Sequence, residues 1–269
     1  MDVGKLPVSA KQRIHSTAVI HSSANIADDV EIGPYAIIGA DVEIGAGSWV
    51  GPHAVINGES KFGKNNKFFQ FCSVGEQPQD FSYAGEPTRL EVGDNNIFRE
   101  FTTIQRGTVK DKGLTKIGND NYFMNYVHIA HDCIIHNNTI FANSCALAGH
   151  VEVFDYAMVG ALCAVHQFCR IGSYSFLARV AQVPKDVPPY LLVTGPGMEL
   201  HGLNAVGLKR RGFSRESITI LRKVFKLFYR EGLSLKDATA EIEKLIPEDD
   251  AVKLFYDFIT AEHSRGIAR

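Results

Sequence analysis

The stretch IGPYAIIGADVEIGAGSWVGPHAVI, residues 32–56, decides the fold. A large apolar residue recurs at every sixth position, from Ile32 through Ile38, Ile44 and Val50 to Ile56. An amphipathic helix needs a period near 3.6 residues and a half-buried strand needs a period of two. A period of six fits a short strand followed by a tight corner. The stretch therefore predicts a parallel β-helix built from hexapeptide repeats.

The same period extends to both sides of this stretch, and glycine often follows the apolar residue. It begins at Ile14, is interrupted after Val74 and again after Ile104, and ends at Val183. The apolar positions outside residues 32–56 are Ile14, Ile20, Ile26, Phe62, Phe68, Val74, Val92, Phe98, Ile104, Ile117, Phe123, Ile129, Ile135, Phe141, Leu147, Val153, Val159, Val165, Ile171, Leu177 and Val183.

Residues two positions before each apolar residue should also point inward, because side chains two apart in a strand share a face. They must be small, because they lie near a corner. They include Ala18, Ala24, Ala36, Ser48, Ala54, Thr102, Thr139, Ala157 and Ala181, and all five cysteines: Cys72, Cys133, Cys145, Cys163 and Cys169. We expect these cysteines to be reduced and buried as small hydrophobic residues.

The interruptions and the C-terminal sequence suggest the domain organisation. Residues 1–190 are expected to form the β-helix, with polar loops inserted at 75–91 and 106–115. Insertions in a solenoid loop out on one side and often serve binding. Residues 191–269 are expected to form a connector and a small α-helical domain. Its helices should start near Ser214 and Ser234 and stop at Gly232 and Pro247, with a third in AVKLFYDFITAEH.

Net charge and hydropathy argue against a nucleic-acid-binding, secreted or membrane-spanning protein. The net charge of −2 gives no electrostatic footprint for nucleic acid. The N-terminal sequence lacks the apolar run of a signal peptide, and no apolar stretch approaches the length of a membrane span. We therefore expect a cytoplasmic protein without integral membrane association.

The segment HIAHDCIIH, residues 128–136, is the strongest candidate for chemistry. Its histidines and Cys133 suggest zinc at first sight, but the repeat turns Cys133 into the core, so we expect no metal. Three hexads make one coil, so residues 18 apart stack on adjacent coils. His131 and Asp132 then share one corner with Gly149 and His150, and that edge continues to His166 and Gln167.

The remaining histidines of the segment differ in position. His128 should point outward one strand before the corner, and His136 should be ordinary surface on another face.

A histidine beside a carboxylate can act as a general base on a hydroxyl. A backbone N–H at Gly149 could stabilise an oxyanion. No nearby serine or outward cysteine suggests a covalent nucleophile, so direct transfer of a group to a hydroxyl is the simpler interpretation.

Several motifs together resemble the bacterial UDP-N-acetylglucosamine acyltransferases, over nearly the whole chain. They are HIAHDC, LAGHV, AVHQFCRIG, GEPTRLEVGDNN, QRGTV, DVPPY and GLKRRGFSRE. The resemblance implies a left-handed β-helix with a C-terminal helical domain, assembled as a homotrimer with active sites between subunits. It also implies transfer of an (R)-3-hydroxyacyl group from acyl carrier protein to the 3-hydroxyl of UDP-N-acetylglucosamine, the first step of lipid A biosynthesis. No cofactor is implied.

The resemblance also assigns roles to individual residues. His131 is implied as the general base, Asp132 as its orienting partner and Gly149 as the oxyanion donor. The residues implied to bind the substrates are Asp80, His128, His150, His166, Gln167, Asn204, Arg210 and Arg211.

Three positions depart from the family pattern. Ser82 stands where a lysine is common, and Val206 stands where a glutamate is common. Arg179 replaces a glycine that some members have near the acyl pocket, so we expect it to influence acyl length. Ser82 and Val206 keep one alternative open, namely a catalytically weak or silent solenoid that binds acyl carrier protein or assembles a complex.

Overall fold

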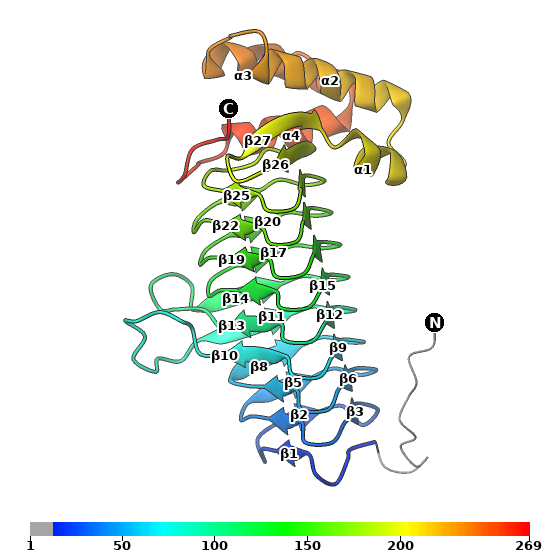
Figure 1. Ribbon diagram of the computed structural model, residues 1–269, viewed down its shortest axis with the longest axis vertical. Coiled ribbons are helices and arrows are strands. Elements are labelled where there is room, and N and C mark those ends of the chain that lie inside the picture. The colour runs from blue at the N-terminus through cyan, green and yellow to red at the C-terminus, as the bar shows by residue number, and fades with distance from the viewer. Residues whose placement is uncertain (1–12) are drawn as a thin grey trace.

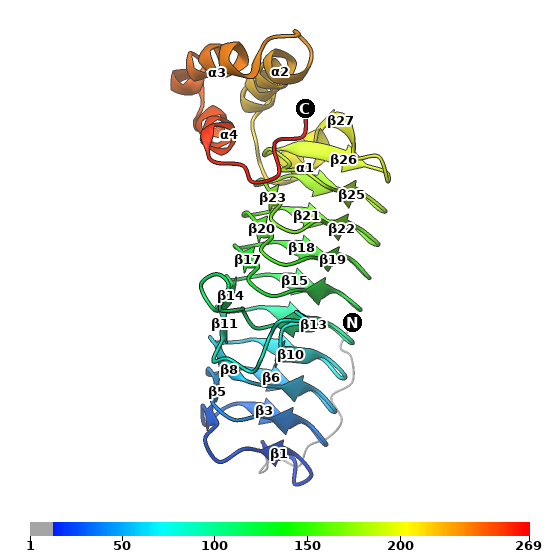
Figure 2. The ribbon, with the colours of Figure 1, turned by 90° about the vertical axis from the view of Figure 1, so that its left-hand side faces the viewer.

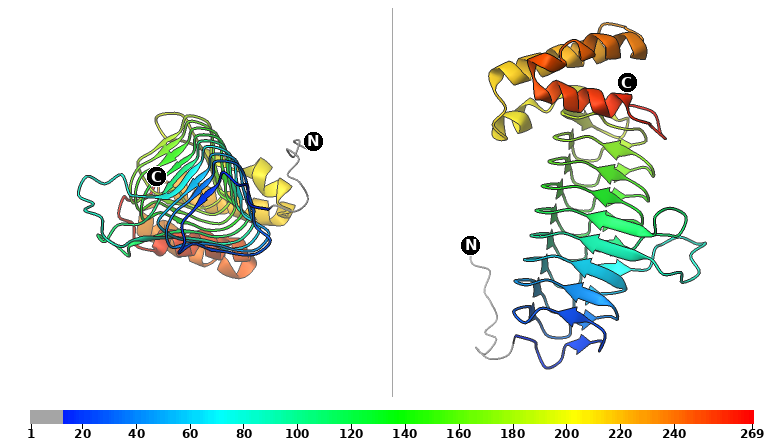
Figure 3. Two further views of the ribbon diagram at one scale, coloured as in Figure 1. Left: turned by 90° about the horizontal axis from the view of Figure 1, so that it is seen from below. Right: turned by 180° about the vertical axis from the view of Figure 1, so that it is seen from behind.

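The computed structural model describes residues 13–269 and contains a left-handed parallel β-helix with helices at its C-terminal end (Figures 1 and 2). Each complete coil adds one short strand to each of three sheets, so the cross-section is triangular (Figure 3). The predicted fold class is confirmed. Residues 1–12 of the expected β-helix domain lie outside the described residues.

The strands follow one another around the triangle. The first sheet contains β1 (Val19–Ile20), β4 (Ile37–Ile38), β7 (Val55–Ile56), β10 (Ser73–Glu76), β13 (Thr103–Gln105), β16 (His128–Ile129), β19 (Ala146–Leu147), β22 (Ala164–Val165) and β25 (Gln182–Val183). The second contains β2 (Asn25–Ile26), β5 (Val42–Ile44), β8 (Glu59–Phe62), β11 (Arg89–Val92), β14 (Leu114–Ile117), β17 (Ile134–Ile135), β20 (Glu152–Val153) and β23 (Arg170–Ile171). The third contains β3 (Glu31–Ile32), β6 (Trp49–Val50), β9 (Lys67–Phe68), β12 (Ile97–Phe98), β15 (Tyr122–Phe123), β18 (Ile140–Phe141), β21 (Met158–Val159), β24 (Phe176–Leu177), β26 (Leu191–Thr194) and β27 (Glu199–Leu203).

The corners between strands use a left-handed backbone conformation at the third residue after the apolar position. Asp132 has φ 59°, His150 has φ 62° and Tyr126 has φ 61°. This region is unfavourable for most side chains and persists only where the surroundings fix it. Hydrogen bonds between coils do so here. The His150 N–H, for example, donates to the His131 carbonyl at 3.0 Å.

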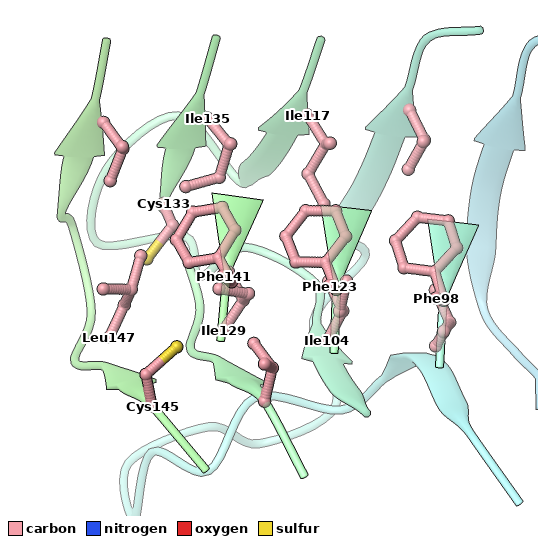
Figure 4. Packing of buried hydrophobic residues seen from close by; sticks show 14 of the residues in the cluster. Phe98, Ile104, Ile117, Phe123, Ile129, Cys133, Ile135, Phe141, Cys145 and Leu147 are labelled. Carbon is pink, nitrogen blue, oxygen red and sulfur yellow. The ribbon is translucent and has the colours of Figure 1, made fainter. Parts of the chain in front are cut away.

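The interior of the β-helix is a continuous stack of the predicted apolar residues from Ile32 to Val183 (Figure 4). At the open N-terminal end, where no earlier coil of the described residues covers them, Ile20 and Ile26 are half-buried and Ile14 is exposed, contrary to the prediction. Phe98, Phe123 and Phe141 lie one above another with ring centroids 5.1 and 4.9 Å apart. All five cysteines are buried and free, which confirms the inward register predicted for them. Burial raises the pKa of the Cys133 thiol to about 12, so it is a poor metal ligand.

Two loops leave the β-helix at the same edge, the one that follows the first sheet (Figure 3). The first loop spans 77–88 and the second loop spans 106–113. Both are shorter than the interruptions in the sequence. The ends of those interruptions join the sheets, because Arg89–Val92 pairs with both β8 and β14.

The C-terminal region begins with more sheet than its sequence suggests. The expected connector contains β26 and β27, an antiparallel hairpin that covers the last coil. Helix α1 (Ala205–Arg210) follows, then α2 (Arg215–Tyr229), α3 (Leu235–Glu243), the 3₁₀ helix η1 (Ile246–Glu248) and α4 (Asp250–Thr260). Ser214 and Ser234 cap α2 and α3 as predicted.

The helices pack on one another and on the end of the β-helix (Figures 1 and 2). Tyr190 is buried beneath them and its hydroxyl donates to the Ala251 carbonyl at 3.1 Å. Within residues 13–269, no helix has the length and apolar character needed to span a bilayer.

Candidate active site

The predicted histidine edge is present, and both inserted loops border it. Strands β16, β19 and β22 are in register, with His128 beside Ala146 and Ala146 beside Ala164. The corners after these strands therefore stack as the 18-residue coil requires. They bring together His131, Asp132, Gly149, His150, His166 and Gln167 on one edge.

His131 and Asp132 form the centre of this edge. Nδ1 of His131 lies 2.8 Å from Oδ2 of Asp132. Because the carboxylate accepts, Nδ1 carries the proton and Nε2 is left as the acceptor. Among residues 13–269, Nε2 has no hydrogen-bond partner. The side chain of His131 is 17% exposed, so Nε2 can reach a bound molecule.

Asp132 is held as an anion in a buried position. Its side chain is fully buried, and burial alone would oppose ionisation. Hydrogen bonds from His131 and from Thr108 outweigh that effect and lower the pKa of the carboxyl below its usual range. The Thr108 N–H donates to Oδ1 at 2.9 Å and its hydroxyl donates to Oδ2 at 2.6 Å.

His150 and Gly149 complete the neighbouring corner. The His150 ring meets the His131 ring edge to face, with centroids 5.3 Å apart. Its Nε2 lies 3.6 Å from Oδ2 of Asp132, and its Nδ1 lies 3.5 Å from Oδ2 of Asp111 in the second loop. The Gly149 N–H donates to no protein group among residues 13–269, so it can bind an external oxygen.

His128 lies on β16, directly before the His131–Asp132 corner, and is largely enclosed. Its Nδ1 lies 2.8 Å from the Thr103 hydroxyl. Burial, followed by the proximity of His131, lowers the pKa of His128, so it is a neutral hydrogen-bonding group near neutral pH. His166 and Gln167 lie at the outer end of the edge and are exposed. Their exposure leaves them free to contact a ligand.

The first loop brings Asp80 to this side of the molecule. Its Oδ2 accepts a hydrogen bond from Nζ of Lys110 in the second loop at 2.6 Å. The N–H and the hydroxyl of Ser82 both donate to Oδ1 at 2.9 Å. The Lys110 ammonium, with these two donors, holds the pKa of the Asp80 carboxyl well below its usual range. Ser82 thus orients Asp80, and the cation beside Asp80 comes from Lys110.

The other predicted binding residues do not lie on the histidine edge of the same chain. Asn204 caps α1, accepting from the Gly207 N–H at 3.1 Å and donating to the Tyr174 carbonyl at 3.0 Å. The Arg211 guanidinium lies 4.7 Å from the centroid of the Tyr156 ring, at the edge that follows the second sheet. Arg210 and Val206 are exposed on α1.

Arg179 occupies the remaining edge, which follows the third sheet. It is exposed and forms no ion pair with any of residues 13–269. The structure therefore distributes the predicted residues over all three edges of the triangle.

His136 lies apart from the site but is not bare surface. Its Nε2 lies 3.0 Å from Oε1 of Glu152, and its ring stacks on Phe154 with centroids 4.8 Å apart. His136 lies on another face, as expected, and its side chain is 35% exposed, while the stacked coils place Phe154 beside its ring.

Sequence reasoning missed four residues that contact the site: Thr103, Thr108, Lys110 and Asp111. Thr103 could have been found from the coil register, because it pairs with His128. The other three belong to the second loop, which leaves the β-helix at the edge that carries the HIAHDC corner. That position in the repeat was the signal in the sequence that the loop would contact the site.

The ligand atoms of His131, Asp132 and His150 lie within 4.8 Å of one another, close enough to surround a cation. In the arrangement present, Nδ1 of His131 is hydrogen-bonded to Asp132 instead of facing a common centre with it. A histidine held in this way by a carboxylate has the geometry that a general base requires.

Comparison with known proteins gives consistent results over nearly the whole chain. The family model for UDP-N-acetylglucosamine O-acyltransferase, domain 2, matches residues 186–268. The model for bacterial transferase hexapeptides (six repeats) matches residues 23–58 and 114–149.

Individual relatives agree with these models. The acyl-[acyl-carrier-protein]–UDP-N-acetylglucosamine O-acyltransferase of Thiobacillus denitrificans is 50% identical over 256 residues, 95% of this chain and 99% of the relative. That of a Janthinobacterium species is 48% identical over 260 residues, again 95% of this chain and 99% of the relative. The solved structure of Francisella novicida UDP-N-acetylglucosamine acyltransferase is 45% identical with a TM-score of 0.92, over 95% of this chain and 94% of that chain.

Proposed function

The chain belongs to the acyl-[acyl-carrier-protein]–UDP-N-acetylglucosamine O-acyltransferases, and on this premise we propose its reaction and the residues that perform it. It transfers an (R)-3-hydroxyacyl group from acyl carrier protein to the 3-hydroxyl of UDP-N-acetylglucosamine, the first step of lipid A biosynthesis. One observation carries the assignment of the chemistry. It is the His131–Asp132 pair, with Nε2 available beside the Gly149 N–H, which donates to none of residues 13–269.

The reaction begins with removal of a proton from the sugar hydroxyl. Nε2 of His131 takes this proton, while Nδ1–H remains donated to Asp132. The buried anionic carboxylate stabilises the imidazolium that forms. The hydroxyl oxygen attacks the thioester carbonyl, and a C–O bond forms.

The tetrahedral intermediate then collapses. The Gly149 N–H is available to donate to its oxyanion. The C–S bond breaks, and the imidazolium of His131 returns its proton to the departing thiolate. The products are the acylated sugar nucleotide and the free thiol of acyl carrier protein, and the histidine is neutral again.

Substrate binding uses the remaining polar groups of the edge. His128, His150, His166 and Gln167 line the acceptor and donor around His131. Asp80, oriented by Ser82, is positioned to accept hydrogen bonds from sugar hydroxyls. This arrangement supports an active enzyme over a silent solenoid, because Ser82 and Lys110 together hold Asp80 in place.

We also propose that the enzyme is a homotrimer with C₃ symmetry, a closed point group. Asn204, Arg210 and Arg211 lie away from the histidine edge, so a neighbouring subunit is needed to bring them to the same nucleotide. Arginine suits the diphosphate and the uracil because its donors form a fixed planar fork.

An exposed apolar edge supports the same assembly. It follows the third sheet and carries stacked residues on successive coils, with centroid distances of 5.1, 5.2, 5.4 and 4.8 Å along the ladder from Tyr35 to Tyr126. Exposed apolar surface of this extent marks an interaction site. The corner residues of this edge are Tyr35, His53, Phe71, Phe101, Tyr126, Ser144, Leu162 and Val180, of which His53 and Ser144 are polar.

Two experiments test the proposal. Acyl transfer from (R)-3-hydroxyacyl carrier protein to UDP-N-acetylglucosamine should be measurable with the purified chain and should be lost in His131→Ala. Sedimentation equilibrium should give about 90 kDa, three times the chain mass of 29.6 kDa. Full activity of a stable monomer would exclude the trimer, and a folded protein without any transfer would exclude the reaction.

A further inference from the structure

The second loop places one side chain behind the His131–Asp132 pair. Thr108 is 2% exposed and lies against the carboxylate of Asp132. It donates twice, once to each oxygen: its N–H to Oδ1 at 2.9 Å and its hydroxyl to Oδ2 at 2.6 Å. Oδ2 is also the oxygen that accepts from Nδ1 of His131.

The fold of the corner does not depend on this contact. The Asp132 backbone has the same left-handed conformation as the other corners, and its N–H donates to the Thr115 hydroxyl at 2.8 Å. The backbone is thus fixed independently of the carboxylate. Thr108 instead fixes the plane of the Asp132 carboxyl group, because its N–H and its hydroxyl each bind one of the two carboxylate oxygens.

We propose that Thr108 is a positioning residue for acyl transfer, which acts through Asp132 to fix the orientation and tautomer of the His131 imidazole. This inference rests on the proposed function, in which His131 is the general base. A group that orients a catalytic or metal-ligating histidine through an intervening residue commonly affects the reaction rate, although it does not touch the substrate.

The charged surroundings make the contribution of Thr108 measurable. His131 and His150 face the Asp132 carboxylate, Asp111 faces His150 from the second loop, and His128 lies near His131. Without the Thr108 hydroxyl, Oδ2 loses its short donor and accepts more strongly from Nδ1 of His131, which favours the protonated imidazole. The acidic limb of the kcat/KM profile should therefore move to higher pH.

The experiment compares Thr108→Val, Thr108→Ser and Thr139→Val in the full chain. Valine keeps the shape and the backbone N–H of residue 108 and removes the hydroxyl. Thr139 is a matched control, because it is fully buried and donates a hydrogen bond of the same length, 2.6 Å, to Oδ1 of Asn121, away from the site. Thr108→Val should lower kcat by about 10–100-fold with little change in KM for UDP-N-acetylglucosamine.

Thr108→Ser should restore most of the activity and the pH profile, because it returns the hydroxyl. Thr139→Val should lower the melting temperature and leave kcat and the pH profile as in the wild type. A wild-type kcat and pH profile in Thr108→Val would overturn the proposal, as would the same kinetic loss in Thr139→Val. If Thr108→Val does not fold, Thr108→Ala, which adds no bulk, is judged by the same criteria.

His131→Ala, measured alongside, separates this inference from the function on which it rests. If His131→Ala is inactive and Thr108→Val is normal, the positioning role is wrong and the general base stands. If His131→Ala is active, the assignment of the base itself is wrong.

Discussion

Gly149 and His131 are so close that only glycine fits at position 149 without displacing the imidazole. A Cβ added to Gly149 would lie 2.6 Å from Cε1 and 3.0 Å from Nε2 of His131. The two residues are 18 positions apart in the sequence and occupy the same corner on adjacent coils.

Gly149→Ala should therefore inactivate the enzyme while leaving its backbone N–H in place. The methyl group pushes the His131 ring from its position, and we expect kcat to fall by about 100-fold, in the range that a positioned base contributes. Gly197→Ala is the control, because a Cβ there meets nothing within 4 Å. Normal turnover by Gly149→Ala would show that the His131 ring moves without consequence.

Three substitutions in residues 128–136 should fail in different ways. His131→Ala should lower kcat by about 10²–10⁴-fold in a folded protein. Cys133→Ala should keep its activity and lose some stability through a small cavity, because the thiol is fully buried. His136→Ala should keep its activity and lose a little stability, because it removes the contacts with Glu152 and Phe154.

Steady-state acyl transfer and thermal melting on these three variants give the check. Loss of activity in a folded Cys133→Ala protein, or its retention in His131→Ala, contradicts the assignment of the general base.

His128 should make stability depend on pH. Burial and the nearby His131 lower its pKa in the folded protein, so the unfolded chain takes up the proton first. This contribution to stability is complete above the unfolded pKa, about 6.5, and is lost as the pH falls through the folded pKa. Melting temperatures of wild type and His128→Gln between about pH 8 and pH 5 test this. The difference in melting temperature between the two proteins should narrow or reverse toward low pH. Parallel curves would argue against a role of His128 in the pH dependence.

Arg179→Gly should shift the preference toward longer acyl chains. Arg179 is exposed beside Val180 on the apolar edge proposed as the subunit contact, where a groove between subunits can receive the acyl tail. Each methylene that the long side chain excludes forgoes about 0.8 kcal/mol of burial. Rates with acyl carrier proteins of graded chain length measure the shift. Arg179→Lys is the control, and an identical profile for Arg179→Gly removes Arg179 as the determinant.

Removal of metal should not change activity. The cysteines are buried in the core, and Nδ1 of His131 is engaged by Asp132. Elemental analysis and assays after dialysis against a chelator provide the test. Stoichiometric zinc that is lost together with activity would show that His131, Asp132 and His150 hold an ion instead of a proton.

The periodic part of the molecule was predictable from sequence because one rule applies at every coil. The register placed Cys133 inside and stacked Gly149 on His131, and local capping signals placed the starts of α2 and α3. The β26–β27 hairpin was missed, because its segment is rich in glycine and has no six-residue pattern.

The contacts of the loops were not predictable in the same way. Lys110 meets Asp80 and Thr108 meets Asp132 across 30 and 24 positions of sequence, through loop conformations that no period describes. The edge at which Arg211 lies depends on how many coils precede the helices. Its separation from the His131 edge could therefore be deduced only once that number was known.

The coil length also restricts which changes in chain length the protein can accept. Equivalent residues on adjacent coils are 18 positions apart, but 30 apart across the first loop and 25 apart across the second. Deleting 18 residues within the regular region would shorten the prism and keep every side chain on its own edge. Deleting six would rotate all that follows by one face, and deleting one would turn the core outward. Insertions and deletions that preserve the fold are thus limited to whole coils or to the two loops, where the chain can change in length without moving the rest.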